Sequence, residues 1–248
     1  MENVILEATA IGVQKVFVPG IDLQSSNISI KIALKFPNTV FPFVGIHPNY
    51  SVKNNSQLIE ELIKAKRDQI YAVGEIGLDF YRDFAPHTVQ IEMFENMLNL
   101  AKKYNLPICI HNRDADDEII NVLSKWYTEK SESSENGITG IFHAFNGSNK
   151  IAEFGKAYGF AFGIGGQVTY KKANQLREII KRIGVENIVL ETDAPYLSPV
   201  PFRGKRNVPK NIHVILKALS EILNVPNRQI EELTDNNAYR FLLKKKMP

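Results

Sequence analysis

Residues 70–79, IYAVGEIGLD, are the most informative segment of this chain of 248 residues, because an apolar run passes through two glycines into two carboxylates. The run at 70–74 has the apolar and β-branched composition of a buried strand. The glycines permit a sharp backbone course, so we expect Glu75 to turn inward while Asp79 lies farther out on a loop. A hydrogen bond within that loop is the ordinary role of such an aspartate. Glu75 is therefore the stronger candidate for chemistry in this segment.

The same arrangement recurs in four further strand-like runs, each of which ends in a histidine or an aspartate. These residues are His47 in GIHP, His111 in CIHNR, His143 in FHAF and Asp193 in ETDAP. In a barrel of parallel strands, all carboxyl ends open onto one face, where the loops build the active site. We therefore expect these segments to converge on one pocket.

The order of the predicted elements indicates an α/β fold. Seven strand-like runs alternate with helix-patterned stretches, at residues 14–19, 40–46, 70–74, 107–111, 140–145, 159–164 and 187–191. Residues 88–104 give the clearest helix, with Ile91, Phe94 and Met97 on one stripe. Repeated βα units at this length predict a TIM-like (β/α)8 barrel, as one domain over residues 1–248. Such a barrel has eight strands, so we expect that its first strand, which precedes the helix predicted at residues 1–12, is missing.

The composition favours a soluble, cytoplasmic protein. Its longest apolar runs are far shorter than the ~20 residues that cross a bilayer, and no basic and apolar leader opens the chain. The single cysteine, Cys109, excludes an intramolecular disulfide and a cysteine-rich metal finger. The two-residue period of a strand points Cys109 to the same side as His111, so we expect it to be a buried packing residue beneath the site.

The side chains at the predicted strand ends suit a divalent metal ion. Histidine supplies a neutral nitrogen donor and the carboxylates supply oxygen, a mixture that suits Zn²⁺, Mn²⁺, Fe²⁺ or, less well, Mg²⁺. A lone histidine is more often structural, and the prediction depends on several of them occurring together. Glu75 is the candidate to bridge two ions. Asp193 has three possible roles: it binds a metal, accepts a proton from a water molecule, or caps the following turn.

The positive charges are informative through their position. The net charge of +3 favours an acidic partner only weakly. Arg203, Lys205 and Arg206, however, follow the ETDAP segment by about ten residues. We expect them to lie beside the rim of the pocket, where they suit contacts with phosphate groups.

Seven segments together resemble a known family. VGIHPN, AVGEIGLDFY, LPICIHNRDA, IFHAFNGS, FGIGGQVTYKKA, VLETDAPYLSP and PFRGKRNVP are similar to the successive signature blocks of the TatD family of metal-dependent deoxyribonucleases, in the same order. The FGIGGQVTYKKA block is most similar to the YjjV-type members. The resemblance spans the chain from about Gly12 onward, and implies a (β/α)8 barrel of the amidohydrolase-like kind that hydrolyses DNA phosphodiester bonds.

The resemblance also implies roles for individual residues. It makes Glu75 a bridging and catalytic ligand, His111 and His143 ligands of one ion, and Asp193 a ligand and proton acceptor at the other. The cofactor it implies is one or two divalent ions, Mg²⁺, Mn²⁺ or Zn²⁺. Family members begin with a strand that ends in a His-x-His pair, and this sequence contains no such pair.

The expected partner is DNA, single-stranded or at its ends, bound by a monomer. The predicted substrate-binding residues are Arg113, Arg203, Lys205, Arg206 and His47. The glycines of FGIGGQVTY indicate close approach of the backbone at a strand end, and a substrate phosphate is a candidate for the approaching group. Two alternatives stay open: a hydrolase of small amides, esters or lactones on the same scaffold, and a poorly active remnant that binds metal or nucleic acid.

Overall fold

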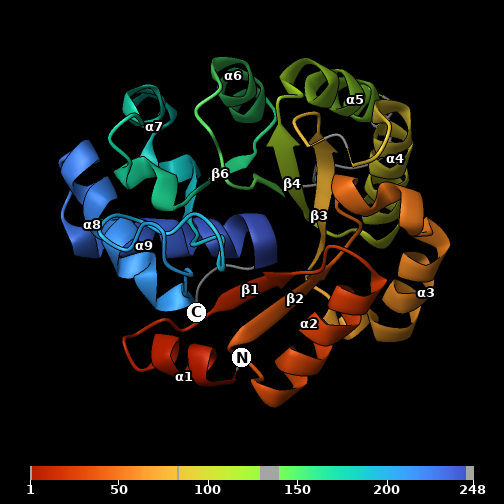
Figure 1. Ribbon diagram of the computed structural model, residues 1–248, viewed down its shortest axis with the longest axis horizontal. Coiled ribbons are helices and arrows are strands. Elements are labelled where there is room, and N and C mark those ends of the chain that lie inside the picture. The colour runs from red at the N-terminus through yellow and green to blue at the C-terminus, as the bar shows by residue number, and fades with distance from the viewer. Residues whose placement is uncertain (1, 83, 129–139, 244–248) are drawn as a thin grey trace. The chain divides into compact units, whose positions relative to one another are not determined.

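The computed structural model describes residues 2–82, 84–128 and 140–243 (Figure 1). The chain divides into two compact units, residues 15–140 and residues 1–14 together with 141–248. Each unit has its own parallel strands and its own group of candidate site residues, and the two are described in turn.

The first unit contains four parallel strands that follow one another in chain order (Figure 1). They are β1 (Val16–Pro19), β2 (Val40–Val44), β3 (Ala72–Asp79) and β4 (Ile108–Arg113). Its helices are α2 (Leu23–Lys35), α3 (Ser56–Lys66), α4 (His87–Tyr104) and α5 (Asp116–Thr128), with 3-10 turns η1 (Pro48–Lys53) and η2 (Arg67–Gln69). Helix α4 confirms the helix predicted at 88–104. Every residue of β2 and β3 is buried, as expected for strands that helices cover.

Strand β3 is longer than its sequence predicts, so Asp79 lies within the strand and not on the loop after it. The predicted run ends at residue 74, whereas the strand continues through Glu75 to Asp79 and pairs there with Arg113. The register shifts between Val73 and Ile76, so the glycine-rich stretch is an irregularity within the strand. A Cβ on Gly77, whose φ is +134°, would lie 2.0 Å from the His111 carbonyl oxygen. The glycines therefore let two strands approach closely, and the expectation that Asp79 lies out on a loop is wrong.

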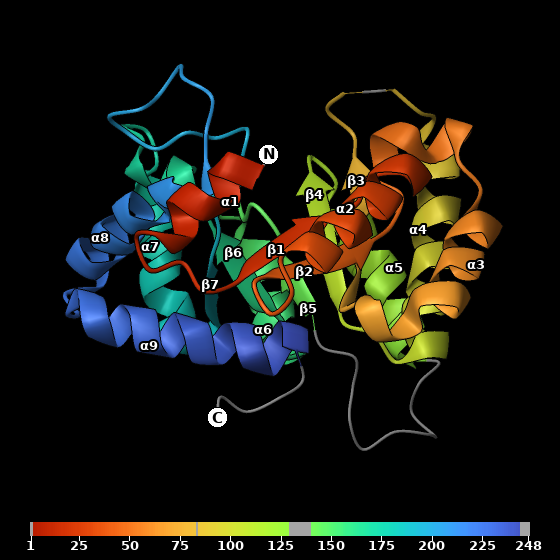
Figure 2. The same ribbon diagram turned by 90° about the horizontal axis from the view of Figure 1, so that it is seen from below.

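The second unit contains three parallel strands, β5 (Gly140–Phe142), β6 (Ala161–Ile164) and β7 (Ile188–Leu190). Its helices are α1 (Glu2–Thr9), α6 (Asn149–Ala157), α7 (Asn174–Ile183), α8 (Ile212–Leu223) and α9 (Asn227–Ala238). Shorter turns are η3 (Gly166–Thr169), η4 (Val185–Asn187), η5 (Pro209–Asn211) and η6 (Tyr239–Leu243). Figure 2 shows the red α1 beside the blue α8, and an ion pair of 2.6 Å joins Glu7 Oε2 to Lys210 Nζ. Helix α1 confirms the helix predicted at the start of the chain.

The predicted alternation of strands and helices is confirmed across the described residues, which contain seven parallel strands. Cys109 is 2% exposed and packs in the core, as predicted. Within the described residues, the helices are all too short or too polar to span a bilayer.

Candidate functional site

Three residues of the first unit form a group with the chemistry of a metal site. Glu75 lies in β3, His111 lies in β4, and His47 follows β2. Glu75 Oε1 is 2.8 Å from His111 Nδ1 and 3.6 Å from His47 Nε2. One ligand atom from each residue lies within 4.8 Å of the others. Two imidazole nitrogens and a carboxylate oxygen at this spacing fit a divalent transition-metal ion.

A backbone hydrogen bond determines how His47 faces this group. The Asn49 amide donates to His47 Nδ1 at 3.2 Å, so the neutral ring carries its proton on Nε2. Nε2 is the atom that faces Glu75. His47 therefore suits hydrogen-bond donation to an anionic oxygen better than metal ligation, in keeping with its prediction as a substrate-binding residue.

Asp79 completes what we call the β2–β4 cluster, which consists of His47, Glu75, Asp79 and His111. Its side chain is buried, and Oδ1 accepts hydrogen bonds from the amides of Tyr81 at 3.1 Å and Arg82 at 3.0 Å. Oδ2 lies 3.5 Å from His111 Nε2. Burial by itself raises the pKa of Asp79, but the His111 ring and the Arg82 amide outweigh it and lower that pKa to about 2. Asp79 thus accepts hydrogen bonds from the loop that follows it, as expected, and also contacts His111 of the candidate metal-binding group.

The second unit contains a comparable group, which we call the β5–β7 cluster: His143, Glu191 and Asp193. His143 follows β5, and the two carboxylates follow β7. His143 Nδ1 is 2.8 Å from Glu191 Oε2, and His143 Nε2 is 3.3 Å from Asp193 Oδ1. The carbonyl of Asp193 accepts the turn hydrogen bond from the Tyr196 amide at 2.7 Å. The Asp193 side chain is therefore directed at histidine, while its backbone forms the turn.

Glu191 is a candidate site residue that sequence reasoning missed. Besides contacting His143, its other oxygen accepts the Ala144 amide at 2.7 Å, so both carboxylate oxygens are engaged by the segment that follows β5. A carboxylate that holds one imidazole nitrogen fixes the ring and directs the other nitrogen outward. The signal was present, because two-residue alternation past a strand end puts Glu191 on the same side as Asp193.

The glycines within and just after β6 have a different role from the phosphate contact suggested for them. A Cβ on Gly163 would lie 2.3 Å from Glu191 Oε2, and one on Gly166 would lie 2.0 Å from the Leu197 carbonyl oxygen. The space at Gly163 is occupied by the carboxylate that holds His143. The absence of a side chain at Gly163 therefore makes room for the Glu191 carboxylate of the same chain, and not for a substrate phosphate.

The predicted basic residues are distributed over both units. In the first unit, the guanidinium carbon of Arg113 lies 3.9 Å from the centre of the Tyr81 ring. In the second, that of Arg203 lies 4.3 Å from the centre of the Tyr170 ring. Arg203, Lys205 and Arg206 are exposed on the loop that follows Asp193.

That loop has a defined course because Asn207 ties it back to β7. The Asn207 side-chain amide donates to the carbonyls of Thr192 and Tyr196, both at 2.7 Å. Ser198 Oγ donates to the Lys205 carbonyl at 2.6 Å. The basic residues are therefore presented from a hydrogen-bonded loop that begins at the β5–β7 cluster.

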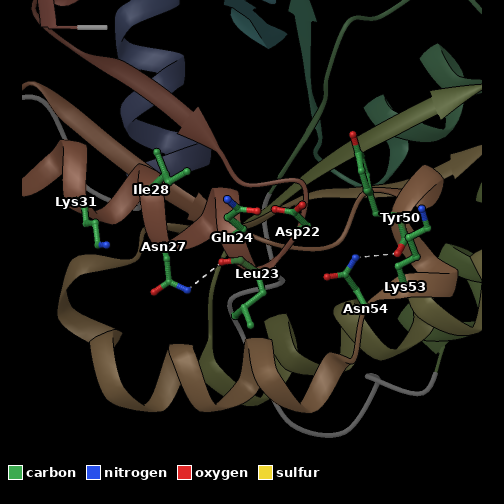
Figure 3. Close-up of a pocket in the computed structure, with 9 residues that line it drawn as sticks. All are labelled: Asp22, Leu23, Gln24, Asn27, Ile28, Lys31, Tyr50, Lys53 and Asn54. Atoms are coloured by element: carbon green, nitrogen blue, oxygen red, sulfur yellow. Dashed lines mark hydrogen bonds between the residues drawn. The ribbon is translucent and has the colours of Figure 1, made fainter.

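A separate depression of about 680 Å³ lies between the start of α2 and η1 in the first unit (Figure 3). It is lined by Asp22, Leu23, Gln24, Asn27, Ile28, Lys31, Tyr50, Lys53 and Asn54. Figure 3 shows that internal hydrogen bonds engage part of this lining, from Asn27 to the Leu23 carbonyl and from Asn54 to the Tyr50 carbonyl. None of its lining residues belongs to the predicted site, so this depression is not the candidate functional site.

Comparison with known proteins agrees with the geometry. The model of the family described as TatD related DNase matches residues 1–243. The chain is 33% identical over 244 residues to the uncharacterized metal-dependent hydrolase YabD of Bacillus subtilis, covering 97% of this chain and 92% of that protein. It is 28% identical over 246 residues to the 3'-5' ssDNA/RNA exonuclease TatD of Pectobacterium parmentieri, covering 97% of this chain and 92% of that protein.

A solved structure gives the fold. The crystal structure of YjjV, a TatD homolog from Escherichia coli K12, matches with a TM-score of 0.88 at 27% sequence identity, covering 100% of this chain and 92% of that one. The predicted fold class, a TIM-like (β/α)8 barrel of the metal-dependent hydrolase type with seven strands in the described residues, is thereby confirmed. The chain therefore belongs to the TatD related DNase family, a family of metal-dependent hydrolases.

Proposed function

We propose that this protein hydrolyses phosphodiester bonds of single-stranded DNA or DNA ends with the help of divalent metal ions. The observation that carries the proposal is the same in both units: a histidine at the carboxyl end of a strand lies between two carboxylates. His111 has Glu75 at 2.8 Å and Asp79 at 3.5 Å, and His143 has Glu191 at 2.8 Å and Asp193 at 3.3 Å. The exonuclease name of the Pectobacterium relative supports a nucleic-acid substrate.

We assign ligand roles to Glu75 and His111 in the β2–β4 cluster and to His143 and Asp193 in the β5–β7 cluster. A bound divalent ion neutralises charge on the scissile phosphate and lowers the pKa of water. Mixed nitrogen and oxygen donors favour Mn²⁺ or Zn²⁺ over Mg²⁺, which prefers oxygen ligands and retains water. Asp193 also acts as the proton acceptor for the attacking water, because its side chain is partly exposed, at 23%, whereas Asp79 is buried at 1%.

Phosphate recognition belongs to the cationic and hydrogen-bond-donating side chains. Arg113 and His47 in the first unit, and Arg203, Lys205 and Arg206 in the second, suit phosphate oxygens. Contacts of this kind position a strand without reading its bases, so little sequence preference is expected. The family match covers residues 1–243 without a break, which supports a single catalytic domain over residues 1–248.

The test is hydrolysis by the purified chain after chelation and reconstitution with Mn²⁺, Zn²⁺ or Mg²⁺. Substrates are end-labelled single-stranded DNA, blunt duplex DNA and a panel of small esters, lactones and amides. Metal-dependent cleavage of single-stranded DNA at higher kcat/KM than the duplex supports the proposal. Turnover of the small substrates alone would overturn it in favour of a small-molecule hydrolase. Metal and DNA binding without any turnover would instead indicate a binding remnant.

A further inference from the structure

The loop that follows β3 presents exposed aromatic side chains, and one of them, Tyr81, is two residues from Asp79 of the β2–β4 cluster. Tyr81 is 63% exposed and Phe84 is 66% exposed. The loop is held at its start, because the buried Asp79 carboxylate accepts the amides of Tyr81 and Arg82. Asp79 also lies 3.5 Å from His111. Asp79 therefore links the position of Tyr81 to His111 of the candidate metal-binding group.

Arg113 covers one face of the Tyr81 ring. It is the last residue of β4, stands opposite Asp79 in the strand register, and its carbonyl accepts the Phe80 amide at 2.9 Å. Its guanidinium carbon is 3.9 Å from the ring centre. A guanidinium that stacks through its face keeps its N–H edge for in-plane hydrogen bonds. Tyr81 is 63% exposed with the Arg113 guanidinium in place, so much of its side chain remains available to a ligand.

We propose that Tyr81, backed by Arg113, is a stacking platform for one nucleobase of a single-stranded substrate, with the guanidinium edge bound to the adjacent phosphate. Every base has a π-face, so such a platform binds single strands without selecting sequence. Arg113 is two residues from His111 along β4, a distance of about 7 Å, which places the platform near the scissile phosphate. This inference rests on the proposed function and makes it more specific: the preferred phosphodiester carries a base.

The other arginine–tyrosine pair does not offer the same surface. Tyr170 is half-buried, and its hydroxyl donates to the Ser198 carbonyl at 3.0 Å. Burial raises the pKa of Tyr170, which the Arg203 guanidinium opposes. The Arg203 pair therefore orders its loop, whereas the Arg113 pair leaves much of the Tyr81 side chain exposed.

The test measures equilibrium binding of a labelled single-stranded oligonucleotide with a chelator present, so that no turnover occurs. A matched oligonucleotide has the same phosphates with abasic sites throughout. We expect Tyr81→Leu to weaken binding of the normal strand about tenfold and to leave the abasic strand unchanged. Tyr81→Trp should restore tight binding. Tyr158→Leu is the control, because Tyr158 is also exposed, at 43%, but precedes β6 and so lies at the amino end of that strand.

Two results would overturn the platform. One is equal binding of the normal and abasic strands by the unaltered protein. The other is a Tyr81→Leu variant that loses affinity for both strands to the same degree, or for neither. Melting temperatures exclude a loss of fold as the cause. Because binding is measured without metal, failure of the platform and failure of hydrolysis are separate outcomes: a protein that never cleaves DNA can still distinguish normal from abasic strands.

Discussion

The β2–β4 cluster and the β5–β7 cluster share a histidine, a glutamate and an aspartate, but their glutamates contact different groups. In each, a histidine has a glutamate at 2.8 Å from Nδ1 and an aspartate near Nε2. In the first cluster, Glu75 Oε1 faces a second imidazole, that of His47. In the second, the other oxygen of the glutamate accepts a backbone amide, that of Ala144. A glutamate that contacts imidazole rings through one oxygen suits a metal ligand, whereas a glutamate that engages a ring and a backbone amide suits a support for the ring.

For the aspartates, it is the side chain in the first cluster that accepts hydrogen bonds from the backbone. Asp79 is buried and accepts two loop amides, whereas the Asp193 side chain is 23% exposed and its turn is held by its carbonyl. If divalent ions bind as proposed, Glu75 and His111 Nδ1 would hold one, and Asp193 and His143 Nε2 would hold the other. The same three residue types therefore do not imply the same set of metal ligands. In each cluster, the carboxylate that already accepts backbone amides is the one that we do not assign as a ligand.

Replacing the glutamate of the first cluster should have the largest effect. We expect Glu75→Ala to abolish metal-dependent hydrolysis, a loss beyond the ~10–100-fold that is typical of residues that only support a ligand. The fold should persist, because the contacts of the Glu75 side chain are with the polar rings of His47 and His111 and removing them leaves the apolar core in place. Metal content and turnover of the reconstituted variant are the measurements. Near-normal turnover in the same metal would show that Glu75 is not a ligand.

The corresponding change in the second cluster should cost less. Glu191→Gln keeps the shape of the side chain but replaces one acceptor, so His143 loses its fixed orientation. We expect metal affinity to fall by about 10–100-fold, measured by calorimetric titration of the metal, with partial activity recovered at high metal concentration. If Glu191→Gln is as inactive as Glu75→Ala at saturating metal, the two glutamates have the same role and the comparison is wrong.

Gly163 provides an independent way to disturb Glu191. In Gly163→Ala the new Cβ would lie 2.3 Å from Glu191 Oε2, so the carboxylate must move. We expect a loss of metal affinity of the same kind, and a Gly163→Ala/Glu191→Gln double variant no worse than the more impaired single variant, because both changes remove one interaction. Gly165→Ala is the control, since a Cβ there would lie 3.6 Å from Glu191, at both Cγ and Oε1, and would instead press on Gln167 Oε1 at 2.9 Å. Simple additivity of the two losses would argue that Gly163 acts elsewhere.

Asp79 should make the stability of the fold depend on pH in the acid range. The pKa of Asp79 is lowered from 3.8 to about 2, so its ionised form stabilises the fold; this contribution is complete above about pH 4 and is lost as the pH falls toward 2. We expect Asp79→Asn to lower the free energy of unfolding at pH 6 by roughly 1–2 kcal/mol. The variant should also show a shallower decline between pH 4 and 2, in urea titrations with a chelator. Asp193→Asn should leave stability at pH 6 nearly unchanged. Parallel pH curves for the unaltered protein and Asp79→Asn would contradict this role.

The order of the strands and the positions of most candidate site residues could be predicted because both follow from short-range patterns in the sequence. Apolar runs mark the seven strands, and the chemistry-bearing residues follow them directly, so His47, His111, His143 and Asp193 lie at the carboxyl ends as predicted. The length of β3 could not be predicted. A run of Gly74, Glu75 and Gly77 has the composition of a turn, and only contact with β4 shows that the glycines serve close strand approach.

The roles of the carboxylates could not be predicted either. Glu191 and Asp193 both fit a ligand by type, and the difference between them arises from the amide of Ala144, 47 residues away in the chain. Likewise, the role of Asp79 depends on its distance from His111 on the next strand. Residue type limits what a side chain can do, but a long-range contact decides which of those options is used.

The smallest expected effects concern the two arginines, and they extend the comparison to substrate binding. If Arg203 and Arg113 each contact one phosphate of a single strand, replacing either with alanine should weaken DNA binding a few-fold and reduce the slope of log K against log[salt] by about 0.7. Lys205→Ala should behave like Arg203→Ala. Arg228→Ala is the control, because it removes the same charge from an exposed position on α9 that pairs with Glu232. Affinity measured from 50 to 300 mM salt gives the slope. A change for Arg113 but none for Arg203 and Lys205 would restrict the strand to the first unit, and an unchanged slope in all three variants would place DNA on another surface.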